Sequence, residues 1–398
     1  MKVVESVKKS AVLAAAVVSL LICLGCSSRM QTPTLKDAGD LDNGVDLFMN
    51  SVDGERVLGG RGSSLACISK DGRFLTMDSG DGADRLLNLS SGWSMDFRPS
   101  GDPMAFSPDS TTLAVARSHE IDFYDLESGK PKGSVDTNAP GPCLEYSADG
   151  SKLILYHLKG LQVIDRETGK EVFNYDTGAM MGDFFILPDG EHLVVQLFEF
   201  GIGADDFVRI KNITNGHIEG EFHDEGHRSN VMVSPDGRYI AYEGGSDFLP
   251  GLMQEQLLVI LDGTDCRKMY SWKKDNRIDA MAFSGDSELL AISNRLANTI
   301  EIYNLNNGSI SQRIKVNNRV KTIALSSDSR FLAVASCKPN YDDDQGGISI
   351  YDLTQKRMVY SKLTFARVDR CEFLPNGKAL ITSGEGGVKY IPLAEFRK

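Results

Sequence analysis

The 398-residue sequence has few tryptophans and histidines, two and six respectively, and its seven cysteines include no Cys-X-X-Cys or Cys/His spacing that suggests a metal site. It has no nucleophile elbow, phosphate-binding loop or dinucleotide-binding glycine motif in the right context. Its long N-terminal apolar run, residues 11–25, is too short to span a bilayer comfortably. These absences predict neither a catalytic residue nor a cofactor, and they do not favour an enzyme.

The sequence also lacks an excess of positive charge. The chain carries 43 basic and 55 acidic side chains, a net charge of −12. Without residues 1–25, which hold three lysines and one glutamate, the net charge is −14. A general nucleic-acid binder needs a basic surface, so no nucleic-acid partner is expected.

What the sequence does contain is a repeated hairpin. Residues 231–242 alternate apolar and polar side chains on both sides of the turn Ser234-Pro235-Asp236-Gly237. Proline presets φ, aspartate bonds back to the backbone and glycine accepts a positive φ. Related turns, spaced 38 to 50 residues apart and all with Asp or Asn at the third place, occur at residues 69–72, 107–110, 147–150, 187–190, 284–287, 326–329 and 374–377.

Eight units with this period and about four strands each predict an all-β propeller of four-stranded antiparallel blades. Seven blades plus one divergent hairpin is the alternative, because unit one has short third and outer strands near residues 85–89 and 93–97. Unit two shows the expected strands at residues 104–106, 113–116, 121–125 and 132–135. Three C-terminal strands, at residues 368–373, 379–382 and 388–393, lack a fourth. Residues 56–58 are predicted to supply it and close the ring; the domain is expected to span residues 45–398.

Several third strands end in a recurrent pair of residues: Tyr124-Asp125, Ile164-Asp165, Tyr303-Asn304 and Tyr351-Asp352. These pairs occupy the position of the Trp-Asp pair in WD repeats, which the chain resembles over nearly all of residues 45–398. The Gly-His pair of that family is missing from most units, and both tryptophans, Trp93 and Trp272, fall in predicted outer strands. The repeats are therefore more similar to bacterial propeller repeats of the YVTN type and of the Tol-system periplasmic protein. This resemblance implies a fold and leaves the activity open.

The N-terminus has the layout of a secretory signal: three lysines, the apolar run and then Leu24-Gly25-Cys26. The last three residues resemble the lipobox of bacterial lipoproteins, although Cys23 stands where that family usually has leucine. The resemblance implies a signal peptide over residues 1–25, acylation of Cys26, a tether over residues 26–44 and an extracytoplasmic protein anchored to a membrane. Ser27 implies the outer membrane, facing the periplasm, in a two-membrane cell. An ordinary cleaved signal is the alternative.

Three connections between second and third strands are long, at residues 198–206, 244–256 and 338–347. The first two carry apolar side chains that suggest a patch for a protein partner, or that fold back over their own blades. The patch comprises Phe198, Phe200, Phe248, Leu249, Leu252 and Met253.

Arginines precede four successive hairpins at nearly the same distance: Arg228, Arg277, Arg319 and Arg367. They predict either an anion site at the mouth of the channel or bonds that hold neighbouring blades together. His223 and His227 are weak candidates for metal ligands, and we predict no metal site. Cys67 and Cys371 lie in blades that meet on closure, where they form either a disulfide or two buried thiols.

The preferred hypothesis is thus a membrane-anchored propeller that binds protein in the bacterial cell envelope. The rival is a lactonase-like or quinoprotein-like propeller that uses an anion site at the channel mouth.

Overall fold

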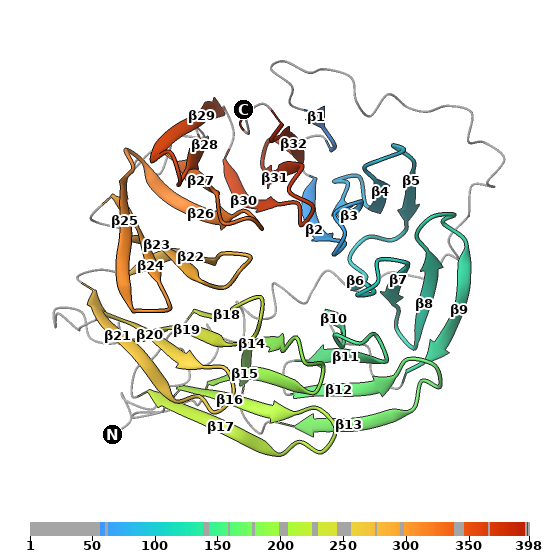
Figure 1. Cartoon of the computed structure of the whole chain (residues 1–398). Coiled ribbons are helices and arrows are strands. Elements are labelled where there is room, and N and C mark those ends of the chain that lie inside the picture. Colours follow the sequence, from blue (N-terminus) through green and yellow to red (C-terminus); the bar gives the residue numbers. More distant parts are fainter. Residues whose placement is uncertain are drawn as a thin grey trace, which may run out of the picture.

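A computed structural model describes residues 56–59, 63–137, 143–157, 160–176, 180–198, 206–224, 230–244, 256–274, 277–294, 298–337, 346–364, 367–394 and 396. Its strands form eight four-stranded antiparallel sheets, arranged in a ring around a central axis (Figure 1). The chain is therefore an eight-bladed β-propeller, and the seven-bladed alternative is excluded.

Each blade runs from an inner to an outer strand. Blade 1 contains β2 (Ser64–Ile68), β3 (Phe74–Asp78), β4 (Asp84–Asn88) and β5 (Ser94–Phe97). Blade 2 contains β6 (Met104–Phe106), β7 (Thr112–Ala116), β8 (Glu120–Asp125) and β9 (Pro131–Asp136). Blade 3 contains β10 (Cys143–Tyr146), β11 (Lys152–His157), β12 (Gly160–Asp165) and β13 (Glu171–Asp176). Blade 4 contains β14 (Met180–Ile186), β15 (His192–Phe198), β16 (Asp206–Asn212) and β17 (Ile218–Asp224).

The second half of the ring follows the same order. Blade 5 contains β18 (Val231–Val233), β19 (Tyr239–Gly244), β20 (Gln256–Asp262) and β21 (Lys268–Lys274). Blade 6 contains β22 (Ile278–Phe283), β23 (Leu289–Asn294), β24 (Thr299–Asn304) and β25 (Ser309–Lys315). Blade 7 contains β26 (Arg319–Leu325), β27 (Phe331–Cys337), β28 (Gly346–Asp352) and β29 (Arg357–Thr364). Blade 8 contains β30 (Val368–Phe373), β31 (Ala379–Gly384), β32 (Lys389–Pro392) and β1 (Arg56–Val57).

The predicted hairpin turns join the first and second strands of all eight blades. In blade 5 the Ser234 hydroxyl donates to Asp236 Oδ1 at 2.8 Å and accepts from the Tyr239 amide at 2.9 Å. The same pair of bonds recurs in the five other blades whose turn begins with serine. The fourth turn residue has a positive φ in every blade, 55° at Ser110 and 76° at Gly237. Local side-chain bonds therefore specify each turn independently of the rest of the ring.

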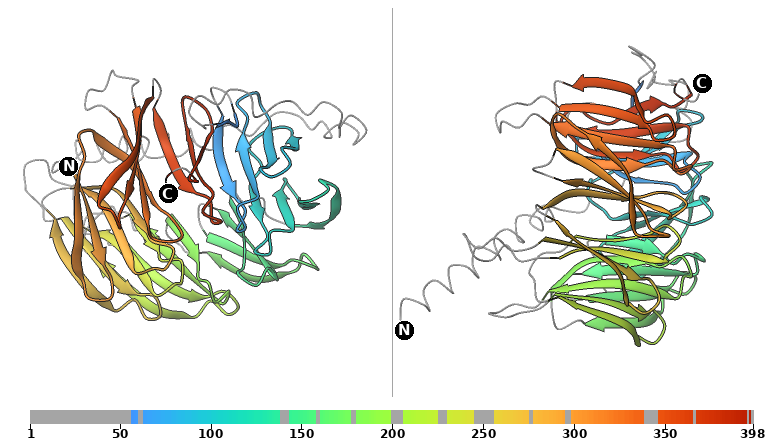
Figure 2. Two further views of the ribbon diagram at one scale, coloured as in Figure 1. Left: turned by 45° about the horizontal axis from the view of Figure 1, so that its top comes forward. Right: turned by 60° about the vertical axis from the view of Figure 1, so that its left-hand side comes forward.

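Eight hydrophobic clusters hold the blades together, one at each interface between neighbours. Because both faces of every sheet are covered, second strands such as Thr112–Ala116 and Tyr239–Gly244 are buried along their whole length. Seen from the side, the blades form a thick disc (Figure 2). No helix of the described part of the chain is long and apolar enough to cross a membrane.

The N-terminal strand closes the ring as predicted. β1 pairs with β32 through Arg56 opposite Tyr390 and Val57 opposite Lys389. The next residue, Leu58, is 1% exposed and packs in the cluster between blades 8 and 1. Across the same interface, Arg370 Nη1 donates to the carbonyls of Leu65 and Ala66 at 3.3 and 3.0 Å. The first and last parts of the fold thus share a buried core and polar bonds.

The described residues decide between the two alternatives for Cys67 and Cys371. Cys67 and Cys371 are free thiols, so the disulfide alternative is not formed. Cys67 Sγ lies 2.9 Å from Thr76 Oγ1. The Asp or Asn that ends several third strands caps the turn into the outer strand; Asp125 Oδ1, for example, accepts from the Ser128 amide at 2.9 Å. Residues 45–55, at the start of the predicted domain, lie outside the described part.

Candidate functional site

The two faces of the disc differ in the segments they carry. The hairpin turns lie on one face, so the connections from second to third strands, and those between blades, lie on the other. Three of the former are long: residues 199–205 between β15 and β16, 245–255 between β19 and β20, and 338–345 between β27 and β28. The structure therefore places the ends of the six flanking strands on one face, called here the loop face.

The predicted partner patch is only partly within the described residues. Phe198 is the last residue of β15, on the loop face. Five other members lie outside the described part: Phe200, Phe248, Leu249, Leu252 and Met253. The patch remains a prediction.

Three of the predicted arginines occupy equivalent places on the loop face. Arg277 directly precedes β22, Arg319 begins β26 and Arg367 directly precedes β30. Arg228 lies outside the described residues. Two residues after each described arginine the inner strand has a β-bulge, at Asp279, Lys321 and Asp369 respectively.

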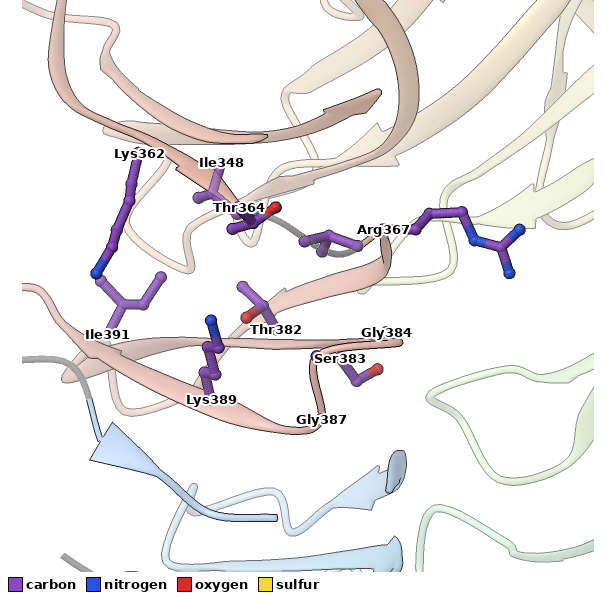
Figure 3. A pocket seen from close by; sticks show the side chains of 12 residues that line it. Ile348, Lys362, Thr364, Arg367, Thr382, Ser383, Gly384, Gly387, Lys389 and Ile391 are labelled. Atoms are coloured by element: carbon purple, nitrogen blue, oxygen red, sulfur yellow. The ribbon is translucent and has the colours of Figure 1, made fainter. Parts of the chain in front are cut away.

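Two of these arginines lie near the carboxylates of bulged residues. Arg319 Nε of blade 7 lies 3.6 Å from Asp279 Oδ2 of blade 6. Arg367 Nε lies 2.7 Å from Asp369 Oδ1 and 3.9 Å from Glu385 Oε1, both in its own blade. The Arg319–Asp279 pair links two blades, as expected if these arginines hold neighbouring blades together. Arg367 is half exposed, and its side chain points away from the cleft between blades 7 and 8 (Figure 3). An anion site there remains a prediction, and any anion would compete with these carboxylates.

An inner strand carries an acidic group that sequence reasoning missed. Glu145 lies on β10 and keeps part of its surface exposed. The loss of water around its carboxyl among the neighbouring protein atoms raises the pKa of this group to about 7. At the equivalent position of blade 8 stands Glu372, which accepts from Arg370 Nη2 at 2.9 Å. Counting back two residues from each turn serine or leucine would have identified both glutamates.

A small cleft lies between blades 7 and 8 (Figure 3). Ile348 and Ile391 line it together with Thr364 and Thr382, and Lys362 and Lys389 stand at its edge. Its volume of about 20 Å³ holds roughly one water molecule. As it stands, the cleft does not accommodate a substrate.

No group of three or more His, Cys, Asp or Glu side chains in the described residues is arranged to hold a metal ion. His223 lies within the outer strand β17 rather than on a loop, and its ring packs 4.8 Å from that of Phe207. His227 lies outside the described residues.

Together, the blade repeat and the caps at the ends of the third strands define a β-propeller with WD-like repeats. No protein-family model and no curated protein matches the chain in sequence. Solved structures do match its fold. A eukaryotic initiation factor structure aligns with a TM-score of 0.58 at 16% identity, covering 82% of this chain and 81% of that one.

Two other structures are similar at comparable identity. A chain of a mitotic checkpoint complex aligns with a TM-score of 0.51 at 17% identity, covering 73% of this chain and 90% of that one. The β-propeller domain of Cps50 (Swd1) from Myceliophteria thermophila aligns with a TM-score of 0.48 at 14% identity, covering 70% and 94%. At these identities the likeness to the initiation factor and checkpoint complex structures shows the fold alone.

Proposed function

We propose that this chain is a membrane-anchored, extracytoplasmic propeller that binds a protein of the bacterial cell envelope through its loop face. The observation that carries the proposal is the concentration of the three long connections on that face. A rigid ring with one elaborated face presents long loops on a fixed scaffold, which is how many binding surfaces are built.

The residue types in two of these connections favour a protein partner over a small anion. Large aromatic and aliphatic side chains are typical of the buried centre of protein interfaces. The described arginines of the same face already have carboxylates or other partners nearby. An anionic ligand would have to displace these partners, so the lactonase-like or quinoprotein-like alternative receives less support.

The anchor is proposed from Cys26 and the sequence before it. Metabolic labelling with an alkyne fatty acid should tag the wild-type chain and leave Cys26→Ser untagged. Equal labelling of both chains would contradict acylation at this cysteine.

Partner binding is tested by affinity purification from detergent extracts of crosslinked cells. Alanine at Phe200, Phe248, Leu249 and Leu252 should remove a partner that the wild type retains. The matched control carries Val172→Ala and Ile218→Ala, which truncate exposed apolar side chains, 38% and 45% exposed, on the outer strands of blades 3 and 4. A partner retained by the patch variant, or lost equally from the control, would count against the loop face.

A further inference from the structure

The outer strands of the propeller carry basic side chains on one part of its rim and acidic side chains on another. β21, β25 and β29, the outer strands of blades 5, 6 and 7, carry seven basic side chains and no acidic one. β13 and β17, the outer strands of blades 3 and 4, carry five acidic side chains and no lysine or arginine. On a chain of net charge −12, this concentration of one sign marks a distinct surface. The basic rim comprises Lys268, Lys273, Lys274, Arg313, Lys315, Arg357 and Lys362.

Not all of these charges face solvent. Lys274 is 7% exposed and is paired with Glu301, which also accepts from Arg313. Lys268, Lys273, Lys315 and Arg357 are exposed. The basic rim therefore has exposed basic side chains on the outer strands of three successive blades. These strands are labelled β21, β25 and β29 in Figure 1.

Apolar side chains stand between these cations. Leu363 is 73% exposed, Met358 50% and Met269 38%. Tyr270 and Trp272 stack at 5.5 Å on the half-buried side of β21. Exposed aliphatic groups among lysines and arginines, with aromatic rings beside them, are the composition of surfaces that lie at a membrane interface.

The three strands are not suited to bind a peptide by strand addition. Each has a β-bulge near its start, seen as a register shift at Ile260/Leu261, Ile302/Tyr303 and Ile350/Tyr351 of the partner strands. Bulges at an edge disrupt the regular row of backbone groups that a further strand requires. A partner would therefore be bound by the side chains of this rim, and its charge would contribute more to binding than backbone hydrogen bonds.

The chain enters the fold beside this rim. β1 is the outer strand of blade 8, which follows blade 7 and its outer strand β29 around the ring (Figure 1). Residues that precede Arg56 therefore join the disc at its edge, rather than at either face. A lipid on Cys26 would tether the disc from this edge through residues 27–55.

We propose that the basic rim of blades 5 to 7 docks the propeller edge-on against an anionic lipid surface. The proposal rests on the membrane anchoring of the proposed function, and adds the orientation in which the anchored disc sits. The partner is the phosphate-bearing surface of a bilayer, bound by charge. The cleft beside Lys362 and Lys389 holds only about one water and is too small for a lipid headgroup. Edge-on docking leaves the loop face open to a protein partner.

Lysine acetylation of the full-length chain in vesicles, measured by mass spectrometry, tests this orientation. Vesicles contain phosphatidylcholine alone or mixed with anionic phosphatidylglycerol, and flotation reports anchoring separately. On anionic vesicles Lys268, Lys273 and Lys315 should react several-fold more slowly than on neutral ones, and added salt should restore their reactivity. Lys130 and Lys170, exposed on blades 2 and 3, should react equally on both.

Two matched variants each lack two lysines, one pair on the basic rim and the other pair on blades 2 and 3. Lys268→Gln with Lys315→Gln should restore the reactivity of Lys273, since each lost cation weakens binding about 5-fold, equivalent to ~1 kcal/mol per Lys or Arg. Lys130→Gln with Lys170→Gln should leave Lys273 protected.

Each remaining outcome contradicts the proposal in a different way. A chain that floats with vesicles but keeps all lysines equally reactive overturns docking and leaves anchoring intact. A chain that floats with neither vesicle overturns both. Protection that appears without lipid and grows with protein concentration would show that a second copy, with its acidic blades 3 and 4, occupies the rim instead.

Discussion

Lys274 Nζ on blade 5 lies 2.7 Å from Glu301 Oε2 on blade 6, and the two side chains are only 7% and 12% exposed. Lys274 also bonds to the hydroxyl of Tyr303, which donates to Glu301 Oε2 at 2.8 Å. This buried ion pair joins two blades near their outer edge, where the hydrophobic cluster between them ends.

Glu301→Gln should destabilise the propeller strongly. It leaves the Lys274 ammonium buried without its counter-charge, a change that costs about 3 kcal/mol or more. Urea unfolding followed by circular dichroism measures the loss. Arg313→Gln is the control: Arg313 also bonds Glu301 but is 63% exposed, so its loss should cost less than about 1 kcal/mol. Equal losses for both variants would contradict a buried pair.

The Lys274–Glu301 pair also predicts that the stability of the propeller changes with pH in the acid range. Burial by itself would raise the pKa of Glu301, but the bonds from Lys274, Arg313 and Tyr303 outweigh it and lower that pKa to about 2 from 4.5. A depressed carboxyl pKa stabilises the fold above the unfolded-state value, and this contribution is lost as the pH falls through the folded-state value. The gap in melting temperature between wild type and Glu301→Gln should therefore narrow from about pH 4.5 to about pH 2; a constant gap would refute this assignment.

For His192 we expect the opposite pH dependence: the stability that it contributes is lost as the pH rises. Its Nδ1 lies 2.8 Å from Asp189 Oδ2 and its Nε2 3.0 Å from Glu219 Oε2. Burial alone would lower the pKa of His192, but hydrogen bonds to both carboxylates outweigh it and raise that pKa above 6.5. The stabilisation is complete below the unfolded-state pKa and is lost as the pH rises through the folded-state pKa. His192→Gln should thus lower the melting temperature more at pH 5.5 than at pH 8.5, whereas a pH-independent effect would argue against the charged pair.

Ring closure by the N-terminal strand predicts that alanine substitutions at two neighbouring residues, Leu58 and Val57, differ in their effect on stability. Leu58→Ala empties a site in the cluster between blades 8 and 1, and should cost about 2 to 5 kcal/mol. Val57→Ala, at a position 39% exposed, should cost much less. Urea unfolding compares the two. If Leu58→Ala were as stable as Val57→Ala, residues 56–59 would not be closing the ring.

The bonds made by the hairpin serines predict that replacing one of these serines lowers the stability of the propeller. Ser234→Ala removes the acceptor of the buried Tyr239 amide and the donor to Asp236, and should cost about 1 to 3 kcal/mol. Ser271→Ala, exposed on β21, should change stability by less than about 0.5 kcal/mol. Thermal melting that fails to separate the two variants would contradict the role of the turn.

The blades were predictable from the sequence because their turns are specified locally. Ser234, Asp236 and Gly237 determine one hairpin through bonds within six residues, and the repetition of this chemistry gives the blade count. The closing strand was also predictable, because three C-terminal strands require a fourth. These inferences depend on residues close together in the chain or on counting.

Contacts between blades were not predictable in the same way. Lys274 and Glu301 are 27 residues apart, and their pairing depends on the register of two different sheets. The charge of the rim required knowledge of which strands are outermost and where each begins. The Arg319–Asp279 pair also joins two different blades, so the sequence alone did not identify this carboxylate partner.

The claim that a protein partner binds the loop face is tested most directly by photocrosslinking in intact cells. Asn317 and Ser327 are exposed and stand just beyond opposite ends of β26, on the loop face and the hairpin face respectively. A photoreactive amino acid at position 317 should capture one envelope protein of defined mass, and the same residue at position 327 should not. Capture at position 327 alone, or at neither position, would contradict the proposed function.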